Sequence, residues 1–249
     1  MVAGGNPFIH LYDPVSLHTT PLHTLEGHTT NVTAVGFQKD KKWIFTCSED
    51  KTVKIWDTRA KGYQRNYQTT SPIVSGVLHP NQGEIYTTDE KGVLRIWNLA
   101  ADCCSVEIIP EGEQVLNSVS ISSDGNLCVA TSIYGVCFIW NCRKSILEPY
   151  VKLEAHNSYI LNCLFSPDGK LLATTSADRT IKIWNVENRF TLNNILHGHQ
   201  GWIWDCSFSA DSAYLLSASS DTTVKLWNIE SGDIIVEYRG HTKVVTSVV

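Results

Sequence analysis

Histidine, serine and aspartate recur in this sequence at a spacing that a hydrolase could use. His28 is followed by Ser48 and Asp50, and a serine hydroxyl activated by a histidine–aspartate pair is the nucleophile of many acyl-transfer enzymes. The same residue types return twice at the same separations, as His156, Ser176 and Asp178 and as His199, Ser219 and Asp221. A catalytic triad occurs once in an active site, whereas a structural element can recur in every repeat. The threefold recurrence therefore favours a structural role, and we predict that the protein is not an enzyme.

Other catalytic and ligand-binding motifs are scarce in the sequence. Ser48-Glu-Asp-Lys51 matches the Ser-x-x-Lys pattern of some acyl enzymes, but Ser48 already belongs to the recurring set. There is no phosphate-binding loop, no dinucleotide fingerprint and no pair of histidines at metal-ligand spacing. None of the eight cysteines forms a Cys-x-x-Cys pair, and Cys103-Cys104 and the pair Cys137 and Cys142 lack companions for a zinc site. We predict no catalytic residue, no cofactor, no metal site, no small-molecule substrate, and reduced cysteines.

The composition is that of a globular protein, with 249 residues, 43% of them hydrophobic, and a net charge of -5. Basic residues are scattered, so no nucleic-acid partner is expected. Apolar runs of only a few residues predict no transmembrane segment. The first residues lack the pattern of a secretory signal, so we expect a cytosolic or nuclear protein.

Five of the eight tryptophans define a repeat with a period of 41 to 44 residues: Trp56, Trp97, Trp140, Trp184 and Trp227. Each ends a short run of alternating apolar residues, such as Val53-Lys-Ile-Trp56, and Asp or Asn follows each time. A repeat of this length with this signature is typical of one blade of a β-propeller. The sequence therefore predicts an all-β propeller built from four-stranded blades.

The strands of each blade can be placed from the repeat. The predicted second strands are Trp43–Cys47, Glu84–Thr87, Leu127–Thr131, Leu171–Thr174 and Tyr214–Ser217, and turns such as Ser-Pro-Asp-Gly at 166–169 precede them. The five complete blades are predicted over residues 29–68, 70–110, 113–154, 157–197 and 200–239, in a single domain of residues 1–249. The N-terminal residues supply the second, third and fourth strands of a further blade, at 1–5, 9–12 and 21–26. Residues 244–249 begin another first strand.

Three tryptophans lie outside the repeat positions: Trp43, Trp202 and Trp204. Trp202 and Trp204 flank the inward-facing Ile203 of a predicted first strand, so their rings turn away from it. Tyr159 and Leu161 hold the equivalent positions in the preceding repeat. We predict that these four side chains form a protein-binding cluster at the rim of the propeller channel, since exposed aromatic clusters mark such sites. The alternative is that the rings fill the channel or pack on neighbouring loops. Trp43 has no predicted role.

These residues resemble the WD-repeat family over essentially the whole chain. The resemblance implies a hydrogen-bonded tetrad of histidine, serine, aspartate and tryptophan within a blade. The tetrads are His28, Ser48, Asp50 and Trp56; His156, Ser176, Asp178 and Trp184; and His199, Ser219, Asp221 and Trp227. Two repeats depart from the pattern, because Thr69 and Gly112 replace the histidine and Lys91 and Tyr134 replace the aspartate. We expect those two blades to lack the tetrad and to be looser.

A closer resemblance is to the G-protein β-subunit-like subunits of the TOR kinase complexes. It rests above all on Gly201-Trp-Ile-Trp-Asp-Cys206, and also on Ser217-Ala-Ser-Ser-Asp221 and Glu237-Tyr-Arg-Gly-His241. The resemblance implies a noncatalytic scaffold that binds and stabilises the TOR kinase domain, beside other TOR-complex subunits, in nutrient and growth signalling. It implies a location in the cytoplasm and on endomembrane surfaces, and a partner-contact role for Trp202 and Trp204. The alternative is another WD-repeat adaptor, for example a ubiquitin-ligase substrate receptor.

That family has seven blades, whereas this sequence holds five complete repeats. In the arrangement that we favour, residues 242–249 pair with residues 1–26 in a composite blade and close a six-bladed ring, because closure satisfies more backbone groups. In the other arrangement, the chain is an incomplete seven-bladed propeller with exposed sheet edges.

Overall fold

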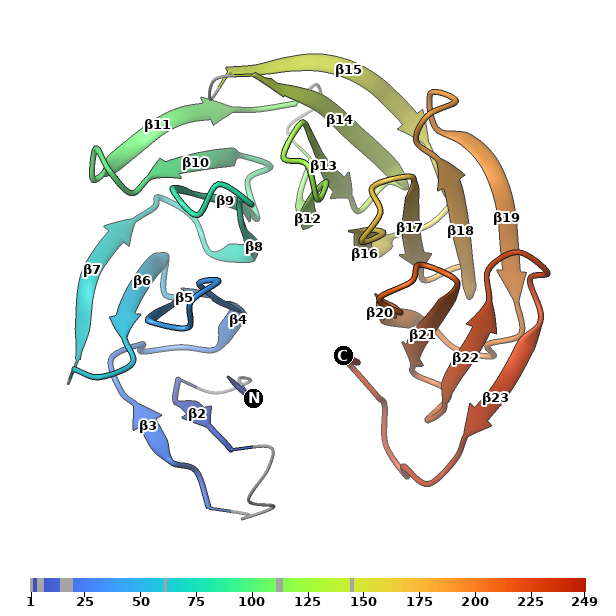
Figure 1. Ribbon diagram of the computed structural model, residues 1–249, viewed down its shortest axis with the longest axis horizontal. Coiled ribbons are helices and arrows are strands. Elements are labelled where there is room, and N and C mark those ends of the chain that lie inside the picture. The colour runs from blue at the N-terminus through green and yellow to red at the C-terminus, as the bar shows by residue number, and fades with distance from the viewer. Residues whose placement is uncertain (1, 4–6, 14–19, 61, 111–113, 144–145) are drawn as a thin grey trace. The chain divides into compact units, whose positions relative to one another are not determined.

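A computed structural model describes residues 2–3, 7–13, 20–60, 62–110, 114–143 and 146–249 (Figure 1). All regular secondary structure in these residues is β-strand, which confirms the predicted all-β class. The strands lie in two compact units, Met1–Ile109 and Pro110–Val249, divided between the second and third predicted repeats. Each unit contains three sheets of consecutive antiparallel strands. A single propeller domain over residues 1–249 stays a prediction.

The first unit contains one sheet of three strands and two sheets of four. The three-stranded sheet consists of β1 (Val2–Ala3), β2 (Ile9–Leu11) and β3 (His23–Leu25). The second sheet consists of β4 (Val32–Phe37), β5 (Trp43–Ser48), β6 (Thr52–Asp57) and β7 (Tyr63–Gln68). The third consists of β8 (Ile73–Leu78), β9 (Glu84–Asp89), β10 (Leu94–Asn98) and β11 (Cys103–Ile108).

The second unit contains three sheets of four strands. They are β12 (Leu116–Ile121), β13 (Leu127–Ser132), β14 (Val136–Arg143) and β15 (Ile146–Glu154); β16 (Ile160–Phe165), β17 (Leu171–Ser176), β18 (Thr180–Asn185) and β19 (Thr191–His197); and β20 (Ile203–Phe208), β21 (Tyr214–Ser219), β22 (Val224–Asn228) and β23 (Ile234–Tyr238). Within this unit the first strands β12, β16 and β20 lie next to one another, and the last strands lie on the opposite side (Figure 1).

The turns between the first and second strands have the chemistry that the sequence predicts. In the fourth repeat, Ser166 Oγ donates to Asp168 Oδ1 at 2.5 Å, and Gly169 adopts a φ of 74°. Glycine adopts this left-handed conformation without the steric cost that a side chain brings. The turn fixes the strand register. In the five complete repeats, each second strand begins at the predicted residue and ends one or two residues later than predicted.

Within each unit, repeat tryptophans pack between one sheet and the sheet before it in the chain; these are Trp56, Trp97, Trp184 and Trp227. Trp97 stacks on Tyr67 of β7 with ring centroids 5.1 Å apart, and Trp56 lies in one apolar cluster with Ile9 and Leu11 of β2. In the second unit, Trp184 clusters with residues of β13 and β14, and Trp227 with residues of β18. Burial of a tryptophan side chain removes up to about 250 Å² of surface from water, so this packing contributes a large share of the stability of the sheet–sheet interfaces.

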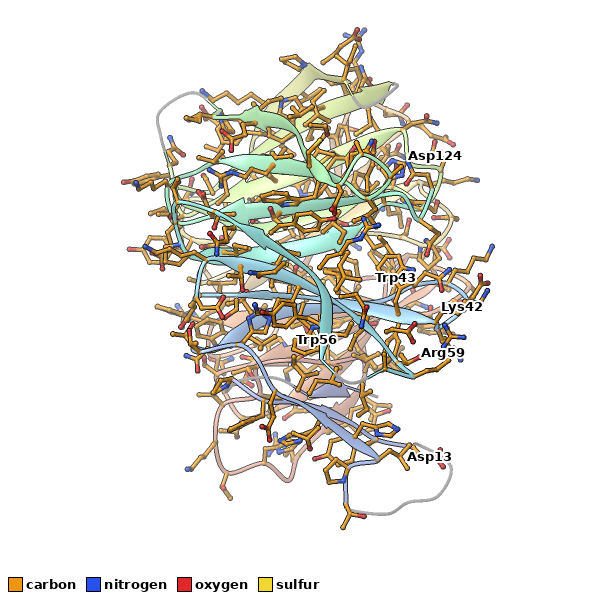
Figure 2. All side chains as sticks on the ribbon, turned by 90° about the vertical axis from the view of Figure 1, so that its left-hand side faces the viewer. Asp13, Lys42, Trp43, Trp56, Arg59 and Asp124 are labelled. Carbon is orange, nitrogen blue, oxygen red and sulfur yellow. The ribbon has the colours of Figure 1, made fainter. Side chains whose placement is uncertain are left out.

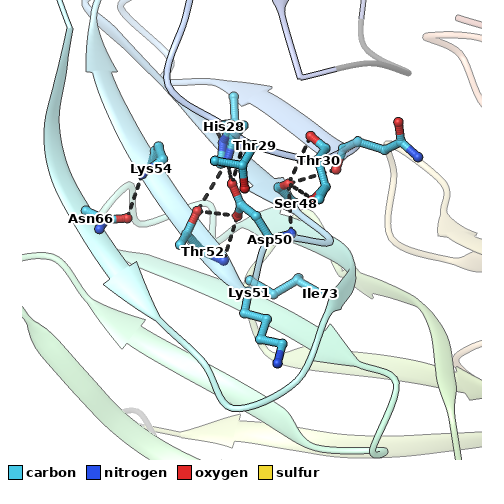
Figure 3. Close-up of polar contacts among 12 residues, drawn as sticks. His28, Thr29, Thr30, Ser48, Asp50, Lys51, Thr52, Lys54, Asn66 and Ile73 are labelled. Atoms are coloured by element: carbon cyan, nitrogen blue, oxygen red, sulfur yellow. Dashed lines mark hydrogen bonds and ion pairs between the residues drawn. The ribbon is translucent and has the colours of Figure 1, made fainter.

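A buried hydrogen-bonded network links the strands of the first complete repeat. Trp56 Nε1 donates to Thr46 Oγ1 at 2.9 Å, and Thr46 Oγ1 lies 2.7 Å from His28 Nε2. His28 Nδ1 lies 2.8 Å from Asp50 Oδ2, and Thr52 Oγ1 also donates to Asp50 (Figure 3). Because an indole N–H can only donate, the Thr46 hydroxyl uses its own hydrogen on His28, and the neutral imidazole donates from Nδ1 to Asp50.

The hydroxyl of this network is Thr46, so the prediction of Ser48 at this place is wrong. Ser48 lies two residues further along β5, where its Oγ donates to Asn31 O at 2.8 Å and accepts from Asp50 N at 3.1 Å (Figure 3). The reason is the strand register, which pairs Trp56 with Ile44. Thr46 is therefore the nearer of the two hydroxyls on that face of β5.

The same correction applies to the other two tetrads. In the fourth repeat, Thr174 rather than Ser176 lies 2.8 Å from His156 Nε2 and 3.0 Å from Trp184 Nε1. In the fifth, Ser217 rather than Ser219 lies 2.7 Å from His199 Nε2 and 2.8 Å from Trp227 Nε1. The histidines lie 2.7 Å from their aspartates, Asp178 and Asp221. Ser176 and Ser219 accept the backbone N–H groups of these aspartates, as Ser48 does in the first repeat.

Burial and hydrogen bonding set the charges of these networks. Burial lowers the pKa of His28 and His199, although the hydrogen bonds to Asp50 and Asp221 oppose the shift. Burial alone would raise the pKa of the Asp221 carboxyl, but hydrogen bonds from Thr223, the Gln200 amide and His199 hold that pKa well below its usual range. Neutral imidazole and ionised carboxylate are therefore the stable pairing.

The second repeat uses a buried ion pair in place of the histidine. Trp97 Nε1 still donates to Thr87 Oγ1 at 2.9 Å. Asp89, which is 1% exposed, accepts from Arg95 Nη1 at 2.5 Å, and Arg95 Nε donates to Glu107 Oε1 at 2.6 Å. The blade lacks the histidine tetrad as predicted, but β9 is buried along its whole length. The prediction of a looser blade is therefore not supported here.

The third repeat has lost the hydroxyl as well. Ala130 holds the position of Thr46 and is fully buried. Trp140 stacks on Phe138 with ring centroids 6.1 Å apart, and Ser132 Oγ accepts the backbone N–H of Tyr134 and of Val136. Gly112 and the predicted blade boundary at residue 113 lie outside the described residues.

Polar side chains connect the first strands of the second unit. Ser118 Oγ donates to Asn162 Oδ1 at 2.8 Å, and Asn162 Nδ2 donates to Asp205 Oδ1 at 2.5 Å. Ser247 Oγ donates to Asp205 Oδ2 at 2.8 Å, so it takes the next place in this polar ladder. The four residues stand at the same position of successive repeats.

The C-terminal segment therefore lies beside β20 where a further first strand would begin, although residues 244–249 form no strand. Val245 N donates to Ser219 O at 3.1 Å and Val248 N donates to Asp205 at 3.0 Å. The sheet of β1, β2 and β3 has three strands. Pairing of residues 242–249 with residues 1–26, and closure of a six-bladed ring, stay predictions.

The corrected tetrad predicts which hydroxyl matters for stability. Thr46→Val keeps the side-chain shape but leaves the buried Trp56 Nε1 and His28 Nε2 without their partner, so we expect it to reduce the free energy of unfolding by about 2–3 kcal/mol. Ser48→Ala, the matched control, is expected to cost about 1 kcal/mol. Urea unfolding of both variants measures the difference. A larger loss in Ser48→Ala would contradict the assignment.

The pKa directions predict that acid destabilises the protein in two steps. The first lies below about pH 6.5, because the unfolded chain binds protons on His28 and His199 that the folded chain, with its lowered histidine pKa, does not. The second lies below about pH 4, as the lowered pKa of Asp50 and Asp221 makes their contribution full above the unfolded value and lost beneath it. Thermal unfolding from pH 7 to pH 3 should show a falling melting temperature in both ranges.

The control for this pH dependence is the double variant His28→Gln/His199→Gln. It should start from a lower melting temperature and change less between pH 7 and pH 5 than the unaltered chain. An equal slope in that range would show that other groups cause the first step.

Candidate protein-interaction site

The candidate site lies at the starts of two neighbouring first strands in the second unit. Ile160 and Ile203 begin β16 and β20 and are fully buried. Alternate residues of a strand point to opposite faces, so Tyr159, Trp202 and Trp204 turn away from this core. Tyr159 and Trp202 are 47% and 43% exposed.

These three rings form a contiguous cluster, which we call the aromatic rim. The Tyr159 and Trp202 rings meet edge to face, with centroids 6.3 Å apart and planes at 88°. The Trp202 and Trp204 centroids are 5.7 Å apart, with the planes tilted by 47°. Such pairs restrict ring motion, so the rim offers a partner a preformed apolar surface. The fourth predicted member, Leu161, is half-buried.

Hydrogen bonds to the adjoining turns hold the aromatic rim in place. Ser220 N donates to Trp202 O at 2.9 Å, and Trp204 Nε1 donates to Ser220 Oγ at 2.7 Å. Gln200 N donates to Asp221 Oδ2 at 2.9 Å, which ties the segment before β20 to the tetrad of the same repeat. The tetrad therefore positions the residues that carry the rim.

Gly201 allows the close approach on which this geometry depends. A side-chain Cβ at this position would lie 2.7 Å from Asp221 N and 3.0 Å from the backbone of Ser220. Backbone atoms cannot yield as the end of a flexible side chain can, so only glycine brings Trp202 this close to the β21–β22 turn.

An open pocket lies beside the rim. Trp202, Trp204 and Gly201 line one side, and Ala177 and Arg179, at the turn between β17 and β18, line the other. Arg179 was not predicted from the sequence. The signal that could have identified it is its place directly after the tetrad Asp178, since that turn lies at the same rim as the start of the first strand.

The alternative role, in which the rings fill the channel or pack on neighbouring loops, fits Trp204 in part and Trp202 poorly. Trp204 is half-buried and hydrogen-bonded to a neighbouring turn, as a ring that packs on loops would be. The Trp202 ring stands against the rings of Tyr159 and Trp204, and the residue is 43% exposed to solvent. The role of Trp202, Trp204, Tyr159 and Leu161 in partner binding stays a prediction.

Trp43, the remaining tryptophan, lines a separate pocket in the first unit. It lies at the start of β5 with Ile55, Leu99 and Arg65 around it. Figure 2 shows Trp43, Lys42 and Arg59 toward one margin of this unit and Trp56 deeper within it. Arg65 donates to the carbonyl of Leu99 and to Tyr67 Oη, so its guanidinium is engaged within the protein.

Residues that could perform other chemistry are buried or dispersed. All eight cysteines are free thiols and six are buried; burial raises the pKa of Cys163 to about 12, which leaves its thiol unreactive. In the described residues, no group of three or more His, Cys, Asp or Glu side chains is placed to hold a metal ion. The described part of the chain also has no helix that is long and apolar enough to cross a membrane.

The sheets, tetrads and repeat tryptophans define a protein built from WD repeats. Three segments, residues 19–57, 147–185 and 190–228, match the family model "WD domain, G-beta repeat". Over 253 residues the chain is 50% identical to target of rapamycin complex subunit wat1 of Schizosaccharomyces pombe, and the match covers all of this chain and 81% of that protein.

Two further relatives agree. The chain is 49% identical to protein LST8 homolog of Dictyostelium discoideum, over 75% of this chain and 62% of that protein. It is 42% identical to target of rapamycin complex subunit LST8 of Saccharomyces cerevisiae, over 80% of this chain and 67% of that protein. The chain belongs to the LST8 family of WD-repeat proteins. Two of these relatives are named as target of rapamycin complex subunits and none of the three names describes an enzyme, which agrees with the prediction that this WD-repeat chain is not an enzyme.

Proposed function

We propose that this chain is a noncatalytic scaffold subunit of a TOR complex that binds and stabilises the TOR kinase domain. The names of its relatives, target of rapamycin complex subunits at 42 to 50% identity, support membership of such a complex. The aromatic rim supplies a surface for the contact. Other subunits of the complex, a role in nutrient and growth signalling, and a place in the cytoplasm and on endomembrane surfaces belong to the same proposal.

The observation that carries the kinase contact is the exposure of Trp202. Its ring is 43% exposed at a position where Tyr159, also exposed, stands edge to face with it. Tryptophan is the residue type most enriched among those that dominate binding energy at interfaces, and it does so when a partner removes it from water. A ring already ordered by its neighbours loses little freedom when the partner arrives.

Trp202→Ala tests the proposal. We expect a loss of at least about 2 kcal/mol of binding free energy for the TOR kinase domain, since the ring is a candidate anchor that the fold itself leaves in solvent. Calorimetry or interferometry with purified kinase domain measures the affinity, and thermal unfolding of the free chain shows whether the fold is kept.

The matched control is Tyr214→Ala. Tyr214 is 38% exposed and lies in the same sheet, at the opposite end of β21 from the rim. It should bind as the unaltered chain does. Unchanged affinity in Trp202→Ala, or a collapse of its melting temperature, would contradict the proposed role of the rim.

A further inference from the structure

Arg179 places an unpaired cation beside the aromatic rim. It adopts a left-handed φ of 70° in the β17–β18 turn, and its side chain is exposed and lines the same pocket as Trp202 and Trp204. Among the described residues, its guanidinium takes part in no hydrogen bond or ion pair, whereas the nearby carboxylates of Asp178 and Asp221 are both hydrogen-bonded.

The neighbouring carboxylates are committed to the tetrads. Asp178 accepts from His156 Nδ1 and from both the backbone N–H and hydroxyl of Thr180. Asp221 accepts from His199, from Thr223 and from the Gln200 amide. These bonds aim both carboxylates into their blades, so the guanidinium keeps its donors for a partner.

Three tetrad repeats allow a comparison of this position. The residue after the tetrad aspartate has a φ of 69° or 70° in each of them, and it is Lys51, Arg179 or Thr222. Lys51 also projects a cation, but the repeat that follows it has Pro72 and Val74 where the repeat that follows Arg179 has Trp202 and Trp204. Of these three turns, the one with Arg179 is therefore the turn that places a cation next to exposed rings.

We propose that the pocket beside the aromatic rim binds an acidic–hydrophobic segment of the kinase partner, with an apolar side chain against Trp202 and a carboxylate on Arg179. This proposal rests on the function proposed above. The fork of a guanidinium matches the two oxygens of a carboxylate and gives the contact a direction. The rings supply an apolar face next to it. A basic segment would be repelled by the charge of Arg179, so the pocket discriminates against such segments.

Charge reversal at Arg179 tests the proposal. With purified TOR kinase domain as the probe, Arg179→Glu should weaken binding about tenfold and Arg179→Gln about threefold. Raising the salt from about 0.1 M to about 0.5 M should shrink the difference between Arg179→Glu and the unaltered chain, because exposed ion pairs are screened. Lys51→Glu is the matched control, with the same backbone conformation and the same charge change, and should not alter the affinity.

The outcomes separate this proposal from the one on which it rests. If Trp202→Ala loses affinity and Arg179→Glu does not, the aromatic rim binds the kinase, but the proposal that the bound segment is acidic is wrong. If neither variant loses affinity, the rim is not the contact and both proposals fail. If Lys51→Glu weakens binding as much as Arg179→Glu, the effect is one of net charge and the specific pairing is wrong.

Crosslinking identifies the bound segment directly. A photoreactive p-benzoylphenylalanine in place of Gln200, which borders the pocket, should crosslink to a kinase segment that has Asp or Glu within a few residues of an aromatic or aliphatic side chain. A crosslinked segment that is basic or lacks a carboxylate would overturn the proposal.

Discussion

The hydrogen bond between a buried tryptophan indole and a strand hydroxyl is the interaction on which this structure depends. The hydroxyl in turn donates to a histidine, and the histidine donates to an aspartate. Four side chains from four places in the chain therefore satisfy one another's hydrogen-bonding groups directly. Each is costly to bury alone, and together they fix the second and third strands, their turn and the entry to the first strand. The same aspartate accepts the amide of Gln200, so the network that stabilises the fifth repeat also sets the backbone from which Trp202 projects.

Periodicity made most of this architecture predictable. The repeat located the second strand of all five complete blades at its first residue, because the third strand that pairs with it carries the repeat tryptophan and has little freedom of register. The histidines and aspartates of the tetrads were found for the same reason. The serines were not, because Thr46 and Ser48 lie on one face of β5, and sequence spacing alone does not say which hydroxyl reaches the indole. Side-chain reach across a strand pair decides that, and it requires coordinates.

Other differences come from substitutions that compensate one another. The second repeat lost its histidine, yet Asp89 and Arg95 form a buried pair there, a solution that is visible only when strand register brings the two together. Removing one partner of this pair would leave an uncompensated buried charge, so the second repeat depends on Asp89 and Arg95 being present together. Arg179 escaped prediction because its neighbours in sequence are tetrad residues and its neighbours in space, the rings of the aromatic rim, belong partly to the next repeat.

Gly201 limits which substitutions the aromatic rim can accept. Because a side chain at this position would collide with the backbone of the β21–β22 turn, the path of the backbone into Trp202 depends on glycine. Substitutions that change the surface without moving this backbone are confined to exposed side chains, such as Gln200 and Arg179. A substitution at either of those positions changes the surface that a partner meets, whereas a side chain at position 201 would displace the backbone that carries the rings.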